Sequence, residues 1–200
     1  MNYSQFNQDL KVLEFYNNKK NGFFIEIGAG DGILESNTYL LETQYEWKGI
    51  CIEPVSYQFT ELYKNRKCKC INKALYSESN KKVIFCEADV PIRHLSGIDT
   101  HLIKDIVFSN SKKVELLTLS FNELLETYDA PKFVDYLSID TEGSEYEILK
   151  TVDFNMYKFG YINVEHNYTE PKRTLIRNLL LKNNYSYIGE NYVDDIYIIK

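Results

Sequence analysis

The sequence predicts an α/β fold, in which a mainly parallel sheet carries helices on both faces and an antiparallel hairpin at the C-terminal end. Three observations support this prediction. Short apolar runs alternate with helical patterns along the chain, as expected when crossover helices join parallel strands. The first apolar run ends in a glycine-rich turn before a helix. The last two runs alternate in polarity around a polar turn, which is a hairpin pattern.

The predicted elements follow one another along the whole chain. A leading helix is expected over 4–17, with Ser4 as its N-cap. Apolar runs predict strands at 23–27, 49–54, 69–75, 83–87, 114–119, 134–139, 161–164, 185–188 and 196–199. Further helices are expected at 36–45, 57–65, 120–128, 145–152 and 171–183. Ser120 and Glu123 form a capping box, and the polar stretch 89–112 predicts a long loop.

Length and composition indicate one globular domain over residues 1–200, which could also be excised from a longer chain. A chain of 200 residues can bury about 70% of its unfolded surface. Hydrophobic residues make up 44% and charged residues 26%, which is ordinary for a soluble domain. No apolar run approaches the roughly 20 residues that span a bilayer, and residues 1–10 lack a signal-peptide core. We therefore expect no membrane insertion and a cytoplasmic location.

Charge argues against nucleic acid as a partner. The formal net charge is −6, and an acidic protein repels phosphate backbones at long range. The lysines between 64 and 73 come closest to a basic patch, but a solvated helix end and turn is the favoured explanation. The four cysteines form no C-x-x-C pair and have no histidine at ligand spacing, so they do not predict a zinc site.

The glycine-rich turn predicts a site for an adenosine-containing ligand. Residues 26–32 read Glu-Ile-Gly-Ala-Gly-Asp-Gly, which differs from the dinucleotide spacing G-x-G-x-x-G. Glu53 lies 25 residues after Gly28, where an acid can accept hydrogen bonds from both ribose hydroxyls. NAD and S-adenosylmethionine (SAM) both offer such a ribose. Glu26 would repel a pyrophosphate but suits the ammonium and sulfonium of SAM. The alternatives are an ordinary strand-to-helix turn and a surface acid beside a proline.

Seven segments in order resemble the FkbM family of SAM-dependent methyltransferases. They are residues 4–9, 24–32, 36–38, 47–54, 96–98, 137–145 and 193–196. The resemblance covers nearly the whole chain. It implies a Rossmann-like class I methyltransferase fold and O-methylation of a sugar or glycan hydroxyl, with a deoxyhexose such as rhamnose as one candidate acceptor. It also fits fusion to glycan-synthesis domains.

The resemblance implies six residues for binding SAM, which are Glu26, Gly28, Gly30, Asn37, Glu53 and Ala74. The first three would hold the methionine part of SAM. Asn37 would help to position its carboxylate, Glu53 would hold the ribose, and Ala74 would lie near the adenine.

Methyl transfer to a hydroxyl calls for a group that removes its proton, or for a metal. Asp140 and Glu142 follow one predicted strand, and Glu165 and His166 end the next, so we expect all four at one edge of the sheet. His166 is the first candidate base because it titrates near neutral pH, and a structural histidine is the alternative. Asp140 and Glu165 are the other candidate catalytic residues. Asp140, Glu142 and Glu165 could instead hold Mg²⁺ through oxygen ligands.

Other groups are weaker candidates. His94, in the long loop, could face the acceptor or be a surface histidine. Gln8 and Asp9 are expected either to line the acceptor pocket or to cap the leading helix, and Tyr168 could stack on a sugar. Two rival functions remain at this point. An NAD-dependent oxidoreductase predicts the dinucleotide spacing of glycines, and a non-catalytic SAM-fold module predicts loss of the acceptor-side groups.

Overall fold

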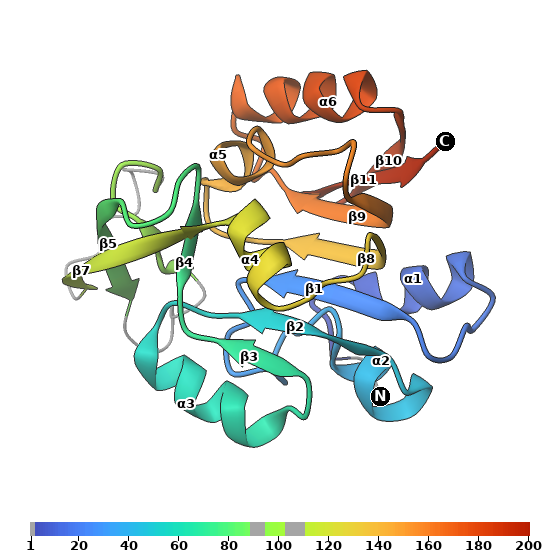
Figure 1. Cartoon of the computed structure of the whole chain (residues 1–200), viewed down its shortest axis with the longest axis horizontal. Coiled ribbons are helices and arrows are strands. Elements are labelled where there is room, and N and C mark those ends of the chain that lie inside the picture. The colour runs from blue at the N-terminus through green and yellow to red at the C-terminus, as the bar shows by residue number, and fades with distance from the viewer. Residues whose placement is uncertain (1–2, 89–94, 103–110) are drawn as a thin grey trace.

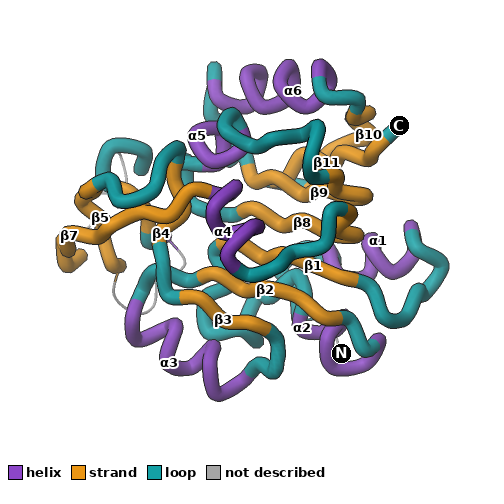
Figure 2. Tube along the Cα trace, viewed as in Figure 1, coloured by secondary structure: helices purple, strands orange, loops and turns teal. Residues whose placement is uncertain are grey.

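The computed structural model describes residues 3–88, 95–102 and 111–200, and these form the predicted α/β fold (Figures 1 and 2). The main sheet contains β1 (Phe23–Ile27), β2 (Lys48–Ile52), β3 (Lys69–Ile71), β8 (Phe133–Ile139), β9 (Lys158–Glu165), β10 (Tyr185–Asn191) and β11 (Asp194–Ile199). Its seven strands lie in the order β10-β11-β9-β8-β1-β2-β3. The strands from β9 to β3 are parallel, and β11 and β10 run antiparallel at one edge.

Helices cover both faces of this sheet, as the strand–helix alternation predicts. They are α1 (Gln8–Phe15), α2 (Tyr39–Tyr45), α3 (Ser56–Asn65), α4 (Phe121–Thr127), α5 (Glu145–Leu149) and α6 (Lys172–Lys182). Successive strand residues point to opposite faces. Phe24 therefore packs in one apolar core with residues of α1, α2 and α3, while Ile25 and Ile27 pack in a second core with residues of α4, α5 and α6.

A second, smaller sheet stands beside the carboxyl ends of the parallel strands (Figure 1). It contains β4 (Ala74–Tyr76), β5 (Lys82–Ala88), β6 (Gly97–Ile98) and β7 (Ser111–Ser120), in the order β4-β7-β5-β6. The single strand predicted over 69–75 is therefore wrong. The Asn72 side-chain amide donates to the backbone oxygens of Glu53, at 2.7 Å, and Pro54, at 3.0 Å. These bonds lie where the chain leaves the main sheet for the second one. The predicted loop 89–112 likewise contains β6 and the start of β7.

Of the two helix caps predicted from the sequence, the one at Ser120 is present and the one at Ser4 is not. The backbone N–H of Glu123 donates to the Ser120 hydroxyl at 3.3 Å, so Ser120 caps α4 as predicted. The second bond of the predicted capping box does not form, because the Ser120 N–H donates to the Ser79 hydroxyl at 2.8 Å. Ser4 does not cap the leading helix. Its hydroxyl donates to Asp9 at 2.5 Å, and α1 begins only at Gln8, after Asn7 with φ of 60°.

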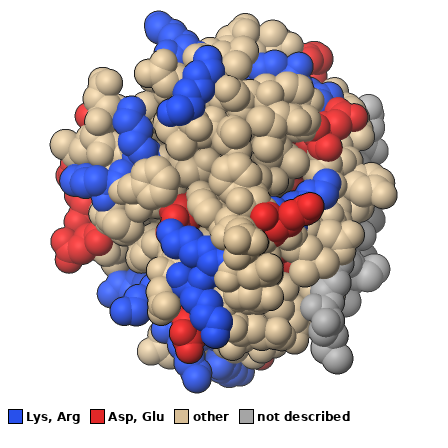
Figure 3. All heavy atoms as spheres, turned by 90° about the vertical axis from the view of Figure 1, so that its right-hand side faces the viewer, with Lys and Arg blue, Asp and Glu red and all other residues tan. Residues whose placement is uncertain are grey.

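The two edges of the parallel sheet differ in charge. Lys48, Lys69 and Lys158 each begin a parallel strand, so they share the edge at which these strands start. This edge lies on the right in Figure 1, and Figure 3 shows Lys and Arg side chains on that side, with Asp and Glu side chains among them. The carboxylates described below lie at the opposite edge. Among the helices of the described residues, none has the length and apolar character needed to cross a membrane.

Candidate active site

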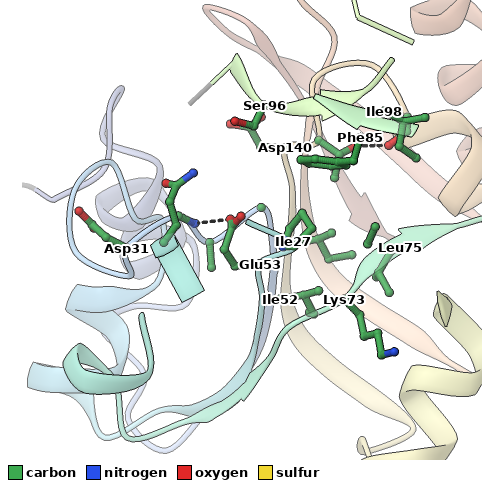
Figure 4. Close-up of a pocket in the computed structure, with 18 of the residues that line it drawn as sticks. Ile27, Asp31, Ile52, Glu53, Lys73, Leu75, Phe85, Ser96, Ile98 and Asp140 are labelled. Atoms are coloured by element: carbon green, nitrogen blue, oxygen red, sulfur yellow. Dashed lines mark hydrogen bonds between the residues drawn. The ribbon is translucent and has the colours of Figure 1, made fainter. Parts of the chain in front are cut away.

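A cavity of about 240 Å³ opens at the carboxyl ends of β1, β2 and β8, the position at which open α/β sheets bind ligands. Figure 4 shows Asp31 and Glu53 on one side of it and Leu75, Phe85 and Ile98 on the other. Four of the six residues expected to bind SAM line this cavity, namely Gly28, Gly30, Glu53 and Ala74.

The glycine turn is held by backbone hydrogen bonds from neighbouring strands. Gly28 has φ of 86° and donates its N–H to the Ile52 oxygen at 3.0 Å. Gly30, with φ of 55°, lies on the cavity wall. Both conformations are ones that glycine adopts without a steric penalty. The turn therefore exposes backbone, instead of side chains, to a ligand in the cavity.

Glu53 connects the end of β2 to this turn. One carboxylate oxygen accepts the N–H of Gly30 at 2.9 Å, and the other accepts the N–H of Val55 at 2.8 Å. Burial nevertheless raises the pKa of Glu53 to about 8, because desolvation outweighs the two backbone hydrogen bonds. A carboxylate offers about four acceptor positions, so further positions are available to hydroxyl donors in the cavity.

Glu26 and Asn37 do not line the cavity. The Glu26 carboxylate is buried and accepts hydrogen bonds from the Thr38 hydroxyl at 2.6 Å and the Asn37 N–H at 2.6 Å. The buried Arg66 guanidinium lies 3.4 Å from it. The Asn37 amide donates to the Ser138 hydroxyl at 2.9 Å. These hydrogen bonds indicate that Glu26 orders residues 36–38. They also hold these residues outside α2, which begins three residues later than predicted. The geometry does not support direct contact between Glu26 and SAM.

The far wall of the cavity is apolar and comes from the second sheet. Ala74, Leu75, Phe85 and Ile98 lie there, and three of them pack in a common apolar cluster. Such a wall suits a flat aromatic ring. The sequence did not single out Phe85, because only the pairing of β5 with β6 brings it to the cavity.

Three carboxyl groups converge beside the cavity. Oxygen atoms of Asp140, Glu142 and Glu165 all lie within 4.8 Å of one another, so the predicted meeting of these residues at one edge is confirmed. Asp140 is solvent-accessible because it faces the cavity, while Glu165 is buried. Desolvation by the surrounding protein raises the pKa of all three groups. Repulsion from Asp194 adds to this effect at Asp140, and repulsion from Asp140 adds to it at Glu142 and Glu165. The same oxygen set would suit a hard cation.

The loop that carries Asp140 and Glu142 is fixed from two sides. Glu145 accepts the N–H groups of Thr141 at 3.0 Å and Gly143 at 2.9 Å. From α6, the Lys172 ammonium donates to the Gly143 oxygen at 2.7 Å. Glu145 and Lys172 were not among the predicted site residues, and their effect on the carboxyl groups is indirect.

His166 does not lie on the cavity that holds the glycine turn. It lines a smaller cavity together with Glu142, Glu165 and Lys172. Its Nδ1 accepts the N–H of Tyr168 at 2.9 Å, and its Nε2 lies 3.6 Å from Asp195. Burial lowers the pKa of His166. Asp140 and His166 share an edge as predicted, but only Asp140 faces the larger cavity.

The remaining candidates have other positions. Asp9 is fully buried and accepts hydrogen bonds from Ser4 and from the N–H of Leu10 at 2.8 Å, which is a structural role. The Gln8 amide donates to Asp194 at 2.9 Å. His94 lies outside the described residues.

Comparison with known proteins identifies the family. The sequence matches the methyltransferase FkbM domain over residues 26–187. The chain belongs to the FkbM methyltransferase family. Its membership confirms the resemblance carried by the sequence motifs and favours SAM over NAD as the cofactor of this FkbM domain. No curated protein is matched by the sequence.

Solved structures agree in fold. A methyltransferase FkbM from Methylobacillus flagellatus KT superposes with a TM-score of 0.55 at 14% identity, covering 89% of this chain and 43% of that one. The METTL16 methyltransferase domain superposes with a TM-score of 0.51 at 13% identity, covering 96% of this chain and 65% of that one. The FkbM domain described here therefore spans less than half the length of the first protein. At these identities the likeness concerns the fold alone, and it confirms the predicted class I methyltransferase fold.

Proposed function

We propose that this FkbM domain transfers the methyl group of SAM to a hydroxyl of a sugar or glycan. One observation carries the proposal. Asp140 belongs both to the wall of the cavity that contains the glycine turn and to the carboxyl cluster with Glu142 and Glu165. Cofactor and proton acceptor would thus meet at a single point.

The cavity fits SAM on the cofactor side. A Cβ atom at Gly28 would collide with the backbone oxygen of Asp140, so only glycine lets the turn pack this closely against the loop that carries Asp140. The turn at Gly28 and Gly30 would hold the methionine part, Glu53 the ribose hydroxyls, and the apolar wall at Ala74 the adenine. SAM supplies an electrophilic methyl group when bound.

On the acceptor side, Asp140 would accept the proton that the hydroxyl oxygen loses. A positioned base of this kind contributes about 10²- to 10⁴-fold to a rate. Glu142 and Glu165 would accept hydrogen bonds from neighbouring hydroxyls, which sugars offer in numbers. The net charge of −6 repels a phosphate backbone at long range, and the lysines that begin the parallel strands lie at the opposite edge of the sheet. These charges favour a sugar over a nucleic acid.

Mg²⁺ remains a prediction from the sequence. The three carboxyl groups offer the oxygen ligands that it prefers. Loss of methyl transfer in EDTA, with recovery on adding Mg²⁺, would support a metal-assisted reaction. An unchanged rate would leave proton removal to the carboxyl group alone.

The identity of the sugar, the cytoplasmic location and fusion to glycan-synthesis domains also remain predictions. A deoxyhexose glycoside such as methyl α-L-rhamnopyranoside is the first acceptor to test, beside glycosides of fucose, glucose and N-acetylglucosamine.

The test combines binding with turnover. Calorimetric titration with S-adenosylhomocysteine (SAH), the demethylated product, is expected to show micromolar binding. Labelled SAM is then expected to transfer its methyl group to at least one glycoside. A folded sample that does not bind SAH would overturn the cofactor assignment. A sample that binds SAH but methylates no glycoside, including oligosaccharides, would overturn the sugar acceptor and favour the alternative of a non-catalytic SAM-fold module.

A further inference from the structure

Three aromatic side chains gather near the carboxyl cluster. The rings of Phe6 and Tyr192 stack with their centroids 4.5 Å apart and their planes 23° apart. The Tyr168 hydroxyl donates to the Tyr192 backbone oxygen at 2.9 Å. Tyr168 is 60% exposed and Tyr192 64%. We propose that this aromatic platform, formed by Phe6, Tyr168 and Tyr192, binds the pyranose ring of the acceptor. The inference rests on the function proposed above.

The platform is built from three segments that are far apart in the sequence. The Phe6 N–H donates to the Gln8 side chain at 2.8 Å. The Asn191 amide donates to the Phe6 oxygen at 2.9 Å, and the Lys11 ammonium donates to the other end of the Asn191 side chain at 2.7 Å. These bonds hold the backbone on both sides of the stacked pair, so the rings have a defined position without being covered.

Two of the three residues adopt a backbone conformation that disfavours them. Tyr192 has φ of 54° and is the first residue of the two-residue turn between β10 and β11, a position that usually takes glycine or asparagine. Tyr168 also has φ of 54°. Such a conformation costs a residue other than glycine about 1–3 kcal/mol and is concentrated at functional sites. Stability alone would therefore favour another residue at position 192.

The platform lies on the acceptor side of the site. Asp194 directly follows the turn that carries Tyr192 and pairs with Glu165 in the sheet. The His166 N–H donates to the oxygen of Val193 at 2.7 Å, which ties the turn to the end of β9. Gln8, which holds Phe6, also donates to the Asp194 carboxylate. The exposed rings are thus connected to the carboxyl cluster through consecutive contacts.

The exposed rings and the carboxyl groups near them indicate which class of ligand the platform would bind. The C–H face of a pyranose is apolar and can lie on exposed aromatic rings, while its hydroxyls can donate to the solvent-accessible carboxyl group of Asp140 in the carboxyl cluster. A nucleobase also stacks on aromatic rings, but the net charge of −6 repels the phosphates that a nucleic acid carries. Ring stacking combined with carboxylate acceptors therefore favours an uncharged sugar.

The test uses the backbone strain at position 192. Asparagine accepts a positive φ better than tyrosine does, so Tyr192→Asn is expected to keep or raise the thermal midpoint of unfolding. The same change is expected to raise KM for the methylated glycoside about tenfold, with kcat and the SAH dissociation constant little changed. Tyr192→Phe keeps the ring and should behave like the native protein. Tyr63→Ala removes an equally exposed ring on α3 and serves as the matched control.

The outcomes separate this inference from the function on which it rests. If the native protein methylates a glycoside and Tyr192→Asn has an unchanged KM, the platform is overturned and the sugar acceptor stands. If the native protein binds SAH but methylates only an oligonucleotide, both proposals fall. A KM that rises equally in Tyr192→Phe would also contradict stacking, because that variant retains the ring.

Discussion

A Cβ atom on Gly28 would lie 1.8 Å from the backbone oxygen of Asp140. The glycine turn and the loop that carries the predicted proton acceptor therefore touch backbone to backbone. This contact is reinforced by the N–H of Asp140, which donates to the Ile27 oxygen at 3.0 Å. The cofactor side and the acceptor side of the FkbM site are thus a single packed unit.

Gly28→Ala is expected to lower the free energy of unfolding by about 2 kcal/mol or more, because the added methyl group collides with Asp140 and the positive φ disfavours alanine. SAH binding should weaken as well, since the turn must move. Gly189→Ala is the control, because Gly189 also has a positive φ, of 142°, but no atom within 4 Å of an added Cβ. Urea denaturation and calorimetry make the comparison. Equal losses in the two variants would argue against the close contact.

Asp140→Asn is expected to reduce kcat for glycoside methylation about 100-fold or more, because it removes the proton acceptor. SAH affinity should stay near the native value, since the amide has the same shape. His166→Gln should retain most of the activity, because His166 does not line the cofactor cavity. Steady-state kinetics of both variants decide between them. Full activity of Asp140→Asn beside an inactive, folded His166→Gln would restore His166 as the base.

Arg66→Met is expected to lower the free energy of unfolding by about 3–5 kcal/mol, the cost of leaving a buried charge without its partner. Arg66 lies beside both Glu26 and Glu42 and has a fully buried side chain. Glu26→Gln should also destabilise the fold while leaving the SAH affinity of the folded protein within a few-fold. A Glu26→Gln variant of native stability that no longer binds SAH would instead support the predicted contact between Glu26 and SAM.

Glu53 predicts a dependence of stability on pH. Its pKa is raised in the folded state from 4.5 to about 8, so the folded state binds the proton more tightly than the unfolded state. The stabilisation that this proton gives to the folded state is therefore complete below pH 4.5 and is lost as the pH rises through 8. The loss reaches at most about 1.4 kcal/mol per pH unit. Urea denaturation between pH 5 and 8.5 measures the free energy of unfolding of the native protein and of Glu53→Gln. The native protein should lose stability relative to Glu53→Gln as the pH rises. A constant difference between the two proteins would contradict the raised pKa.

Sequence patterns predicted correctly those features that depend on strand period, capping chemistry or parallel topology. The end of β1 at the glycine turn, the cap of α4 by Ser120 and the meeting of Asp140, Glu142 and Glu165 all follow from strand period, capping chemistry and parallel topology. The division of the predicted strand 69–75 into β3 and β4 does not follow from such patterns. At this division the Asn72 side chain bonds to the backbone of Glu53 and Pro54, which lie in another part of the sequence.

The sequence by itself determined the α/β class, the family and the edge of the sheet at which the site lies, since these depend on periodicity and on motifs in order. Only the tertiary structure decided which side chains face the cavity. Glu26 and His166 stand at the expected strand ends, yet the alternation of side chains and the partners Arg66 and Asp195 leave both outside the cavity wall. The platform of Phe6, Tyr168 and Tyr192 likewise exists only in the fold, because its three segments meet through contacts that no local pattern encodes.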